Sequence, residues 1–240
     1  MFKYYDKVIK GTEHEDAKVI LQFLKSSVGE QFSFLNYYRE IPVSYDAKLV
    51  SVENDMAEFE LHEYQAKAIS LERKTLIRAH KKSPFREDIV ADVFYVNIAK
   101  KLALLQKFGY AKINSESRRF VRIVLGTPAS VHISLAKDVK LSGVVNDISL
   151  GGAAVSIEPN EFLAAGSEVP VRLVLNDPAN GRNIEMNLRA KIVKVIDNEE
   201  NKLFGCMLEF CHDKDSQQQI SYFINQQQVL IIKELKELVI

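Results

Sequence analysis

Two short segments of the chain carry the residue types best suited to binding an anionic ligand. The first is an arginine cluster of Arg118, Arg119 and Arg122, and the second is an Asp-x-Ser-x-Gly-Gly segment that begins at Asp147, 25 residues after Arg122. The guanidinium fork of arginine matches phosphate oxygens and also the O6 and N7 atoms of guanine. The carboxylate of Asp147 and the hydroxyl of Ser149 accept hydrogen bonds that guanine nitrogens donate. Together these groups suit a ligand that is both an anion and a guanine nucleotide.

The glycines that close the second segment, Gly151 and Gly152, let the backbone come close to a bulky ligand. The even spacing of Asp147 and Ser149 places both side chains on one face of a strand. A simpler explanation stands beside this one, because Asp and Ser also support turns through local hydrogen bonds and glycines also supply positive φ. If the segment is a ligand site, Gly152 acts through shape, since a side chain there should crowd the ligand.

Together the two segments resemble the PilZ domain, a bacterial receptor for cyclic di-GMP. The family pattern is R-x-x-x-R followed by [DN]-x-S-x-x-G, which is met here by Arg118 and Arg122 and then by Asp147, Ser149 and Gly152. The resemblance covers about the second half of the chain, and the first half resembles, more loosely, the amino-terminal domain of two-domain, flagellar-brake-type PilZ proteins. It implies that Asp147 and Ser149 hold guanine and ribose-phosphate atoms while the arginines hold phosphates and stack on bases. The expected ligand-binding residues are Arg118, Arg119, Arg122, Asp147, Ser149, Gly151 and Gly152.

Composition limits the class of protein. A chain of 240 residues with 47% hydrophobic residues fits one large globular domain or two small ones. Lys plus Arg and Asp plus Glu number 32 each, which argues against a general nucleic-acid-binding surface. No run reaches the roughly 18 uncharged apolar residues of a membrane span, and Met1 to Lys18 lacks the apolar segment of a secretory signal. We therefore expect a cytoplasmic protein without membrane insertion.

Metal binding and catalysis are not predicted. Cys206 and Cys211, the two cysteines, differ by an odd number on a predicted strand, so they should point to opposite faces. Neither they nor the five histidines show zinc-ligand spacing. The chain has no G-x-S-x-G elbow, no catalytic triad pattern and no G-x-x-x-x-G-K-[ST] phosphate loop. We expect no enzyme, no metal and no cofactor, and cyclic di-GMP as the ligand.

The elements of the first half predict a helix followed by a small antiparallel barrel, from about residue 30 to 110. The helix covers residues 16–27, where apolar residues recur at helical spacing. Asn54-Asp55 is typical of a hairpin turn, and Ser83-Pro84 marks a loop. The stretch 97–108 fits a strand or a short helix. The expected strands cover residues 43–51, 56–61, 71–79 and 89–95.

A polar stretch that includes Asn114 to Ser117 predicts an interdomain linker over residues 111–122, which carries the arginine motif. A ligand that orders arginines on such a tether would couple binding to domain orientation. The fold class we expect is therefore mainly β with flanking helices: two small antiparallel β-barrels in tandem, the second PilZ-like and followed by a carboxy-terminal helix. The expected domains are residues 1–110 and 123–240.

The second half has the alternation and turn signals of a barrel with antiparallel neighbours. Its turns fall at Asp177-Pro178 and Asn180-Gly181, and a helix begins at about Asp213. The apolar stripe of this helix suits packing on its own domain and also a dimer interface, although Gln217 to Gln219 interrupt any heptad. The expected strands cover residues 129–135, 140–148, 153–157, 169–175, 183–196 and 203–210.

The leading functional hypothesis is a cytoplasmic cyclic di-GMP receptor that couples nucleotide binding to a change in domain orientation and partner interaction. The resemblance implies a protein partner in the flagellar or exopolysaccharide machinery. The alternative is a PilZ-like interaction adaptor that binds no nucleotide, and a third reading is a barrel that binds single-stranded nucleic acid. Whether one or two nucleotides occupy the site is open, because Ser117, the residue before the arginine motif, does not decide it.

Overall fold

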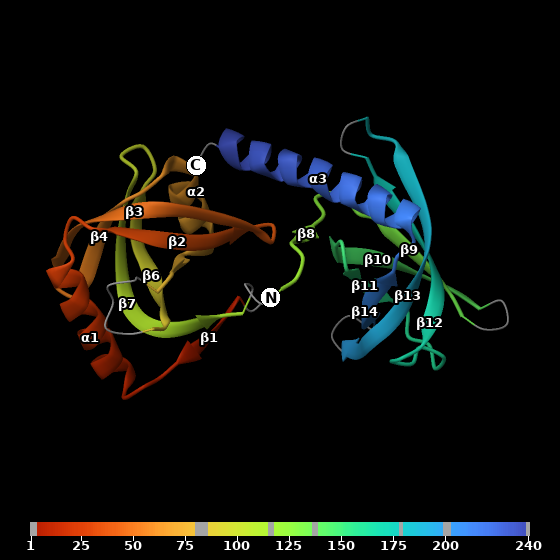
Figure 1. The fold of residues 1–240 in the computed structure, drawn as a ribbon, viewed down its shortest axis with the longest axis horizontal. Helices are drawn as coiled ribbons and strands as arrows, with labels where there is room; N and C mark the ends of the chain where they lie inside the picture. Colours follow the sequence, from red (N-terminus) through yellow and green to blue (C-terminus); the bar gives the residue numbers. More distant parts are fainter. Residues whose placement is uncertain are drawn as a thin grey trace. The chain divides into compact units, whose positions relative to one another are not determined.

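The structure, a computed structural model, describes residues 4–79, 86–114, 118–135, 139–177, 180–198 and 203–238 of the chain (Figure 1). Within these ranges it contains 14 strands and three helices, which confirms the mainly β class. The predicted loop at Ser83-Pro84, the linker residues Ser115 to Ser117, and Pro178 of a predicted turn lie outside the described residues.

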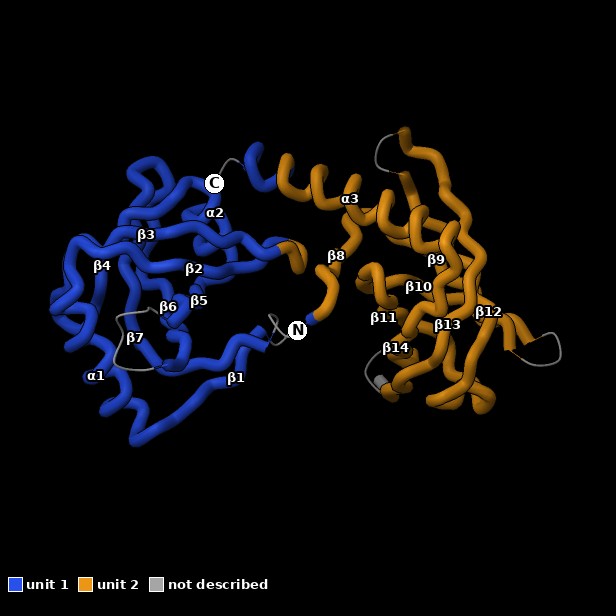
Figure 2. The backbone as a smooth tube through the Cα atoms, in the orientation of Figure 1, with its two compact units in different colours: residues 1–38, 42–118, 234–240 blue, residues 39–41, 119–233 orange. Residues whose placement is uncertain are grey.

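The chain divides into two compact units, drawn in blue and orange in Figure 2. The first unit comprises residues 1–38, 42–118 and 234–240, and the second comprises residues 39–41 and 119–233. The domain boundaries expected from the sequence stay a prediction.

The first unit is built on a closed ring of six strands in the order β7-β4-β3-β2-β5-β6, which the pairing of β6 with β7 closes. Strand β1 pairs with residues 110–113 of β7 and β4 pairs with residues 102–105, so the long β7 carries two neighbours in succession. The elements are β1 (Tyr5–Val8), α1 (Glu13–Ser26), β2 (Gln31–Tyr38), β3 (Ile41–Glu53), β4 (Met56–Glu60), α2 (Glu63–Glu72), β5 (Lys74–Ile77), β6 (Asp88–Asn97) and β7 (Leu102–Ile113).

The second unit is also a six-stranded ring, in the order β11-β14-β13-β12-β9-β10, which the pairing of β11 with β10 closes. The short β8 adds to β10 beyond the end of β9. Two barrels in tandem followed by a helix are therefore confirmed. The elements are β8 (Arg122–Val124), β9 (Ser130–Ser134), β10 (Lys140–Ser149), β11 (Gly152–Ile157), β12 (Glu168–Asn176), β13 (Asn183–Asn198), β14 (Leu203–Cys211) and α3 (Lys214–Glu237).

Local sequence signals explain several element boundaries. Helix α1 starts three residues before the predicted Asp16, because Thr12 and Glu15 form a capping box ahead of the apolar stripe. Asn54 and Asp55 have φ of 45° and 63°, as a two-residue hairpin turn between β3 and β4 requires. The predicted hairpin is thus confirmed.

Other parts of the first unit differ from the sequence-based expectation. Residues 63–72 form helix α2, so the strand expected over 71–79 starts later and is shortened to β5. Arg73 ends α2 in the left-handed conformation, with φ of 59°, and this boundary carries no Gly or Pro signal. The ambiguous stretch 97–108 is a turn leading into β7, in which Asn97 Oδ1 accepts from the Lys100 N–H at 2.9 Å.

Helix α3 is confirmed and begins beside Asp213, whose Oδ1 accepts from the Ser216 N–H at 2.7 Å. These Ser216 hydrogen bonds lower the pKa of Asp213. The last turn of α3 groups with the first unit, where Leu235 packs in a cluster with Val43 and Ala68. There the nearly buried Lys67 donates to the Lys236 carbonyl at 2.6 Å, at the helix end that favours a cation.

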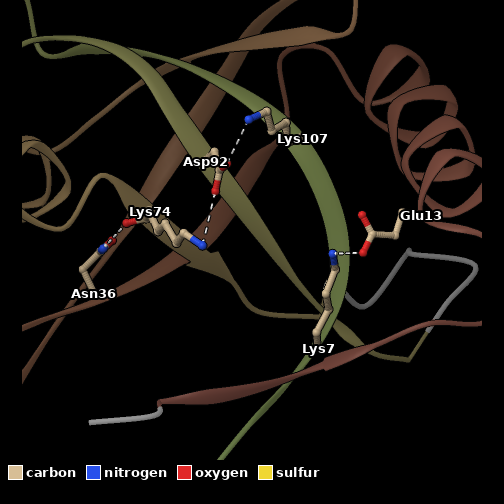
Figure 3. Close-up of polar contacts among 6 residues, drawn as sticks. All are labelled: Lys7, Glu13, Asn36, Lys74, Asp92 and Lys107. Carbon is tan, nitrogen blue, oxygen red and sulfur yellow. Dashed lines mark hydrogen bonds and ion pairs between the residues drawn. The ribbon is translucent and has the colours of Figure 1, made fainter. Parts of the chain in front are cut away.

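The first unit also contains a buried polar network around Asn36, which is 1% exposed. Its Oδ1 accepts from Gln65 Nε2 at 2.7 Å and from Thr75 Oγ1 at 2.8 Å. Its Nδ2 donates to a Glu72 carboxylate oxygen at 2.5 Å and to the Lys74 carbonyl at 2.7 Å, the latter drawn in Figure 3. Through Asn36, strand β2 is therefore tied to both α2 and β5.

Replacing Asn36 with Ala should destabilise the first unit by about 2–4 kcal/mol, because buried donors on Gln65 and Thr75 lose their acceptor. Urea unfolding followed by circular dichroism measures this loss. Asn97→Ala, which removes a hydrogen bond in an exposed turn, is the control and should cost less than about 1 kcal/mol. Equal urea midpoints for the two variants would show that the Asn36 network does not stabilise the first barrel.

Candidate functional site

The pairing of β8 with β10 fixes one arginine of the cluster against the second motif. Ile123 lies opposite Ile148 and Arg122 lies opposite Ser149 in this antiparallel register. Both isoleucines are fully buried, so their packing holds the three-residue β8 in place. Asp147, at the next position of β10, is 3% exposed and follows a bulge after Val145.

These residues open onto a surface cavity of about 290 Å³ on the second unit. Arg122, Asp147, Ser149, Gly151 and Gly152 all line it. Its walls thus combine one guanidinium with carboxylate and hydroxyl oxygens, which suits an anion that also donates hydrogen bonds.

The turn between β10 and β11 is held by hydrogen bonds from two sides. Ser149 Oγ donates to the Gly152 carbonyl at 3.2 Å, and the Phe210 N–H donates to the Gly151 carbonyl at 3.0 Å. His212 Nε2 makes a short contact with the Leu150 carbonyl. The hydroxyl of Ser149 therefore supports the turn in this structure while it also lines the cavity.

Of the two glycines, Gly152 is required for a reason that the sequence did not indicate. Neither has positive φ, so the suggestion that they supply that conformation is wrong. A Cβ on Gly152 would lie 2.0 Å from the backbone carbonyl oxygen of Leu208, on the neighbouring β14. A Cβ on Gly151 would meet only the edge of the Phe120 ring, at 2.8 Å. Gly152 thus allows a close approach between strands whether or not a ligand is present.

The other two arginines do not line the cavity. The guanidinium of Arg119 lies over the ring of its neighbour Phe120, 5.2 Å from the ring centre. Arg118 groups with the first unit, whereas the cavity belongs to the second. A contact of either arginine with a ligand stays a prediction.

Sequence reasoning missed the part of the cavity wall that β13 and β14 supply. Val193 is 53% exposed and Met207 is 39% exposed, so both present apolar surface at the cavity. Val193 is the extra residue of a bulge between Ile192 and Lys194. The bulge interrupts the in–out alternation of side chains, so alternation alone could not predict which way Val193 faces. Glu209, opposite Gly152 in the register, adds a second carboxylate.

The cysteines lie as their odd spacing predicts, with Cys206 buried and Cys211 exposed. Burial raises the pKa of the Cys206 thiol to about 11, so this thiol is protonated at neutral pH. Over the described ranges, no group of three or more His, Cys, Asp or Glu residues is arranged to hold a metal ion. No helix in that part of the chain combines the length and apolarity that crossing a bilayer requires.

Residues 116–226 match the family model described as PilZ domain. The match includes both motifs and most of the second unit, so the resemblance to the PilZ domain inferred from the motifs is confirmed. No curated protein matches the chain.

Solved structures of two-domain length are similar to this chain. The Klebsiella pneumoniae MrkH–c-di-GMP complex is 17% identical with a TM-score of 0.46, covering 95% of this chain and 99% of that one. Escherichia coli YcgR in complex with c-di-GMP is 13% identical with a TM-score of 0.43, covering 92% and 93%. Bacillus subtilis inhibitor of motility MotI/DgrA is 16% identical with a TM-score of 0.40, covering 84% and 98%. These values are too low to transfer what those proteins bind to this chain.

Replacing Gly152 with Ala should destabilise the second unit by about 3 kcal/mol, because the backbone carbonyl of Leu208 cannot move without disturbing β14. Gly151→Ala is the matched control and should cost less than about 1 kcal/mol, since the Phe120 side chain can rotate away. Thermal unfolding without ligand compares the two. If Gly152→Ala leaves Tm unchanged, the close approach to β14 does not require this glycine. Its role would then be only to leave space for a ligand.

Proposed function

We propose that the chain is a cyclic di-GMP receptor and that the nucleotide binds at the cavity formed by β8, β10, β11, β13 and β14. PilZ domains are receptors for this dinucleotide, and both motifs of the family are intact here. The observation that carries the proposal is the register that sets Arg122 opposite Ser149, on a cavity that Asp147 also lines.

Each wall of the cavity fits one part of the ligand. Arg122 supplies a charge-assisted donor for a phosphate oxygen. Asp147 and Glu209 supply carboxylate acceptors of the kind that guanine N1–H and the exocyclic amine need. Val193 and Met207 offer exposed apolar surface against which a base can lie.

The size of the cavity gives the remaining arginines a role. Its volume of about 290 Å³ lies at the lower end of the range for sites that enclose a small molecule. A dinucleotide therefore extends beyond it, and we propose that Arg118 and Arg119 close over the exposed phosphates. Because Arg118 groups with one unit and Arg119 with the other, this closure would reorient the units and change the surface offered to a protein partner.

Calorimetric titration of the full chain with cyclic di-GMP tests the binding step. Arg122→Ala should weaken binding by roughly tenfold to a hundredfold, because it removes a charge-assisted hydrogen bond to phosphate. Arg172→Ala is the control, since this exposed arginine pairs with Glu185 at 2.6 Å and lies outside the cavity. An absence of heat with the unmodified chain, or equal affinities for both variants, would refute the proposal.

Small-angle scattering with and without cyclic di-GMP tests the coupling step. A ligand shifts an equilibrium only through its differential affinity for the two states. At a concentration that saturates the unmodified chain but not the weaker-binding Arg122→Ala variant, ligand should therefore change the scattering profile of the former and leave that of the latter nearly unchanged. Identical profiles for a chain saturated with ligand would leave binding intact but contradict a change in orientation.

A further inference from the structure

A larger cavity lies on the first unit, and no residue of either PilZ motif lines it. Its volume is about 800 Å³, and it lies between helix α1, the β3–β4 turn and strands β6 and β7. His14, Lys18, Leu21 and Lys25 follow each other at three- and four-residue spacing, so one ridge of α1 forms a wall. We call this cavity the α1 groove.

The floor of the α1 groove is apolar. Leu21 and Phe108 are 7% and 3% exposed, and Met56 is half-buried. Phe94 also lines the groove but is 53% exposed, so a large part of its ring faces solvent. An exposed aromatic ring beside a buried apolar floor offers an anchoring position for an apolar side chain.

The rim of the α1 groove carries an excess of positive charge. Lys18, Lys25 and Lys107 line it together with one carboxylate, that of Asp55. Within the described residues, Lys18 and Lys25 are exposed and make no ion pair, whereas Lys107 lies 3.7 Å from Asp92. The whole chain has a formal net charge of zero, so this excess is local.

The acidic residues at the start of α1 do not offset the lysines, because they have other partners. Glu13 pairs with Lys7, a contact drawn in Figure 3, and Glu15 belongs to the capping box. Asp16 is buried and accepts from the N–H groups of Lys10 and Gly11 at 3.0 Å and 3.2 Å. None of these three carboxylates lines the groove.

Strand β7 bulges where it borders the groove. Asp92 pairs with Gln106 and Val90 with Gly109, so β7 has an extra residue there, and Lys107 adopts φ of 52°. A left-handed lysine costs about 1 kcal/mol, and bulges of this kind re-aim side chains. The bulge brings Lys107 and Phe108 together onto the groove.

We infer that the α1 groove is a docking surface for an acidic, amphipathic segment of a protein partner. The partner's apolar side chain packs on Phe94 over the floor, and its carboxylates pair with Lys18 and Lys25. These lysines are seven positions apart on the helix, about 10 Å along its axis, which sets the spacing of the acidic groups. The inference does not depend on nucleotide binding.

The shape and charge of the α1 groove favour a peptide over other anions. A membrane surface needs a protruding or flat patch, whereas this surface is concave. A nucleic acid needs more cations than three lysines and one histidine supply. A free phosphate would leave the apolar floor unused.

The test is fluorescence anisotropy with the full chain and a labelled helical peptide that carries Glu on its polar face and Leu and Phe on the other. Lys18→Glu with Lys25→Glu should weaken binding at least roughly tenfold, since like charges then face each other. Phe94→Ala, at an exposed position that should not disturb folding, should weaken it several-fold. Added salt should weaken the binding of the unmodified chain.

The matched control is Lys48→Glu with Lys100→Glu, which changes the net charge equally at exposed lysines outside the α1 groove and should leave binding unchanged. Equal weakening by both double variants would overturn the inference, because the attraction would then be non-specific. The inference is also overturned if the unmodified chain does not bind the peptide. The same holds if the chain binds phosphatidylserine vesicles and not the peptide.

Discussion

The site on the second unit depends on the pairing of a three-residue strand, β8, with the end of β10. Ile123 and Ile148 are buried at this pairing, and their packing sets Arg122 beside Ser149. Without it the arginine would lie on a free tether, and holding it at a ligand would cost the entropy of ordering that chain. An arginine that is anchored before binding loses less conformational entropy when the complex forms. Only Arg118 and Arg119 would then have to move to reach the ligand.

Bulges shape the proposed binding surface of each barrel. In the second unit, β10 bulges before Asp147 and β13 bulges at Val193, and both residues line the cavity proposed to bind the nucleotide. In the first unit, β7 bulges at Lys107, beside the α1 groove. An extra residue turns a side chain away from the alternation that fills a barrel core. The regular strand positions fill the barrel cores, and the bulged positions place side chains on the two proposed binding surfaces.

The sequence predicted features that rest on local chemistry. Turn residues predicted the Asn54-Asp55 hairpin, and periodicity predicted the two barrels with the helix that follows them. Motif spacing predicted the family resemblance. Helix α2 was not, because Gln65 and Lys67 are buried along with its apolar residues and leave no clean stripe. The cavity wall formed by Val193 and Met207 could not be predicted either. The alternation of apolar and polar residues does not show where a strand bulges, and the pairing partners of a strand depend on the whole barrel. The close approach at Gly152 could not be predicted from the sequence, because the closest atom belongs to β14, more than fifty positions along the chain.

The last turn of α3 gives the molecule a discontinuous architecture. Residues 234–240 group with the first unit, where Leu235 packs beside Val43 and Ala68, and Lys67 donates to a carbonyl near the end of the helix. The second unit is thus topologically an insertion within the first. A fragment that stops before residue 119 would expose that apolar surface and leave the Lys67 ammonium without its carbonyl acceptor. To produce the first barrel as an isolated domain, residues 234–240 should therefore be added as a separate peptide or joined to residue 118 by a short linker.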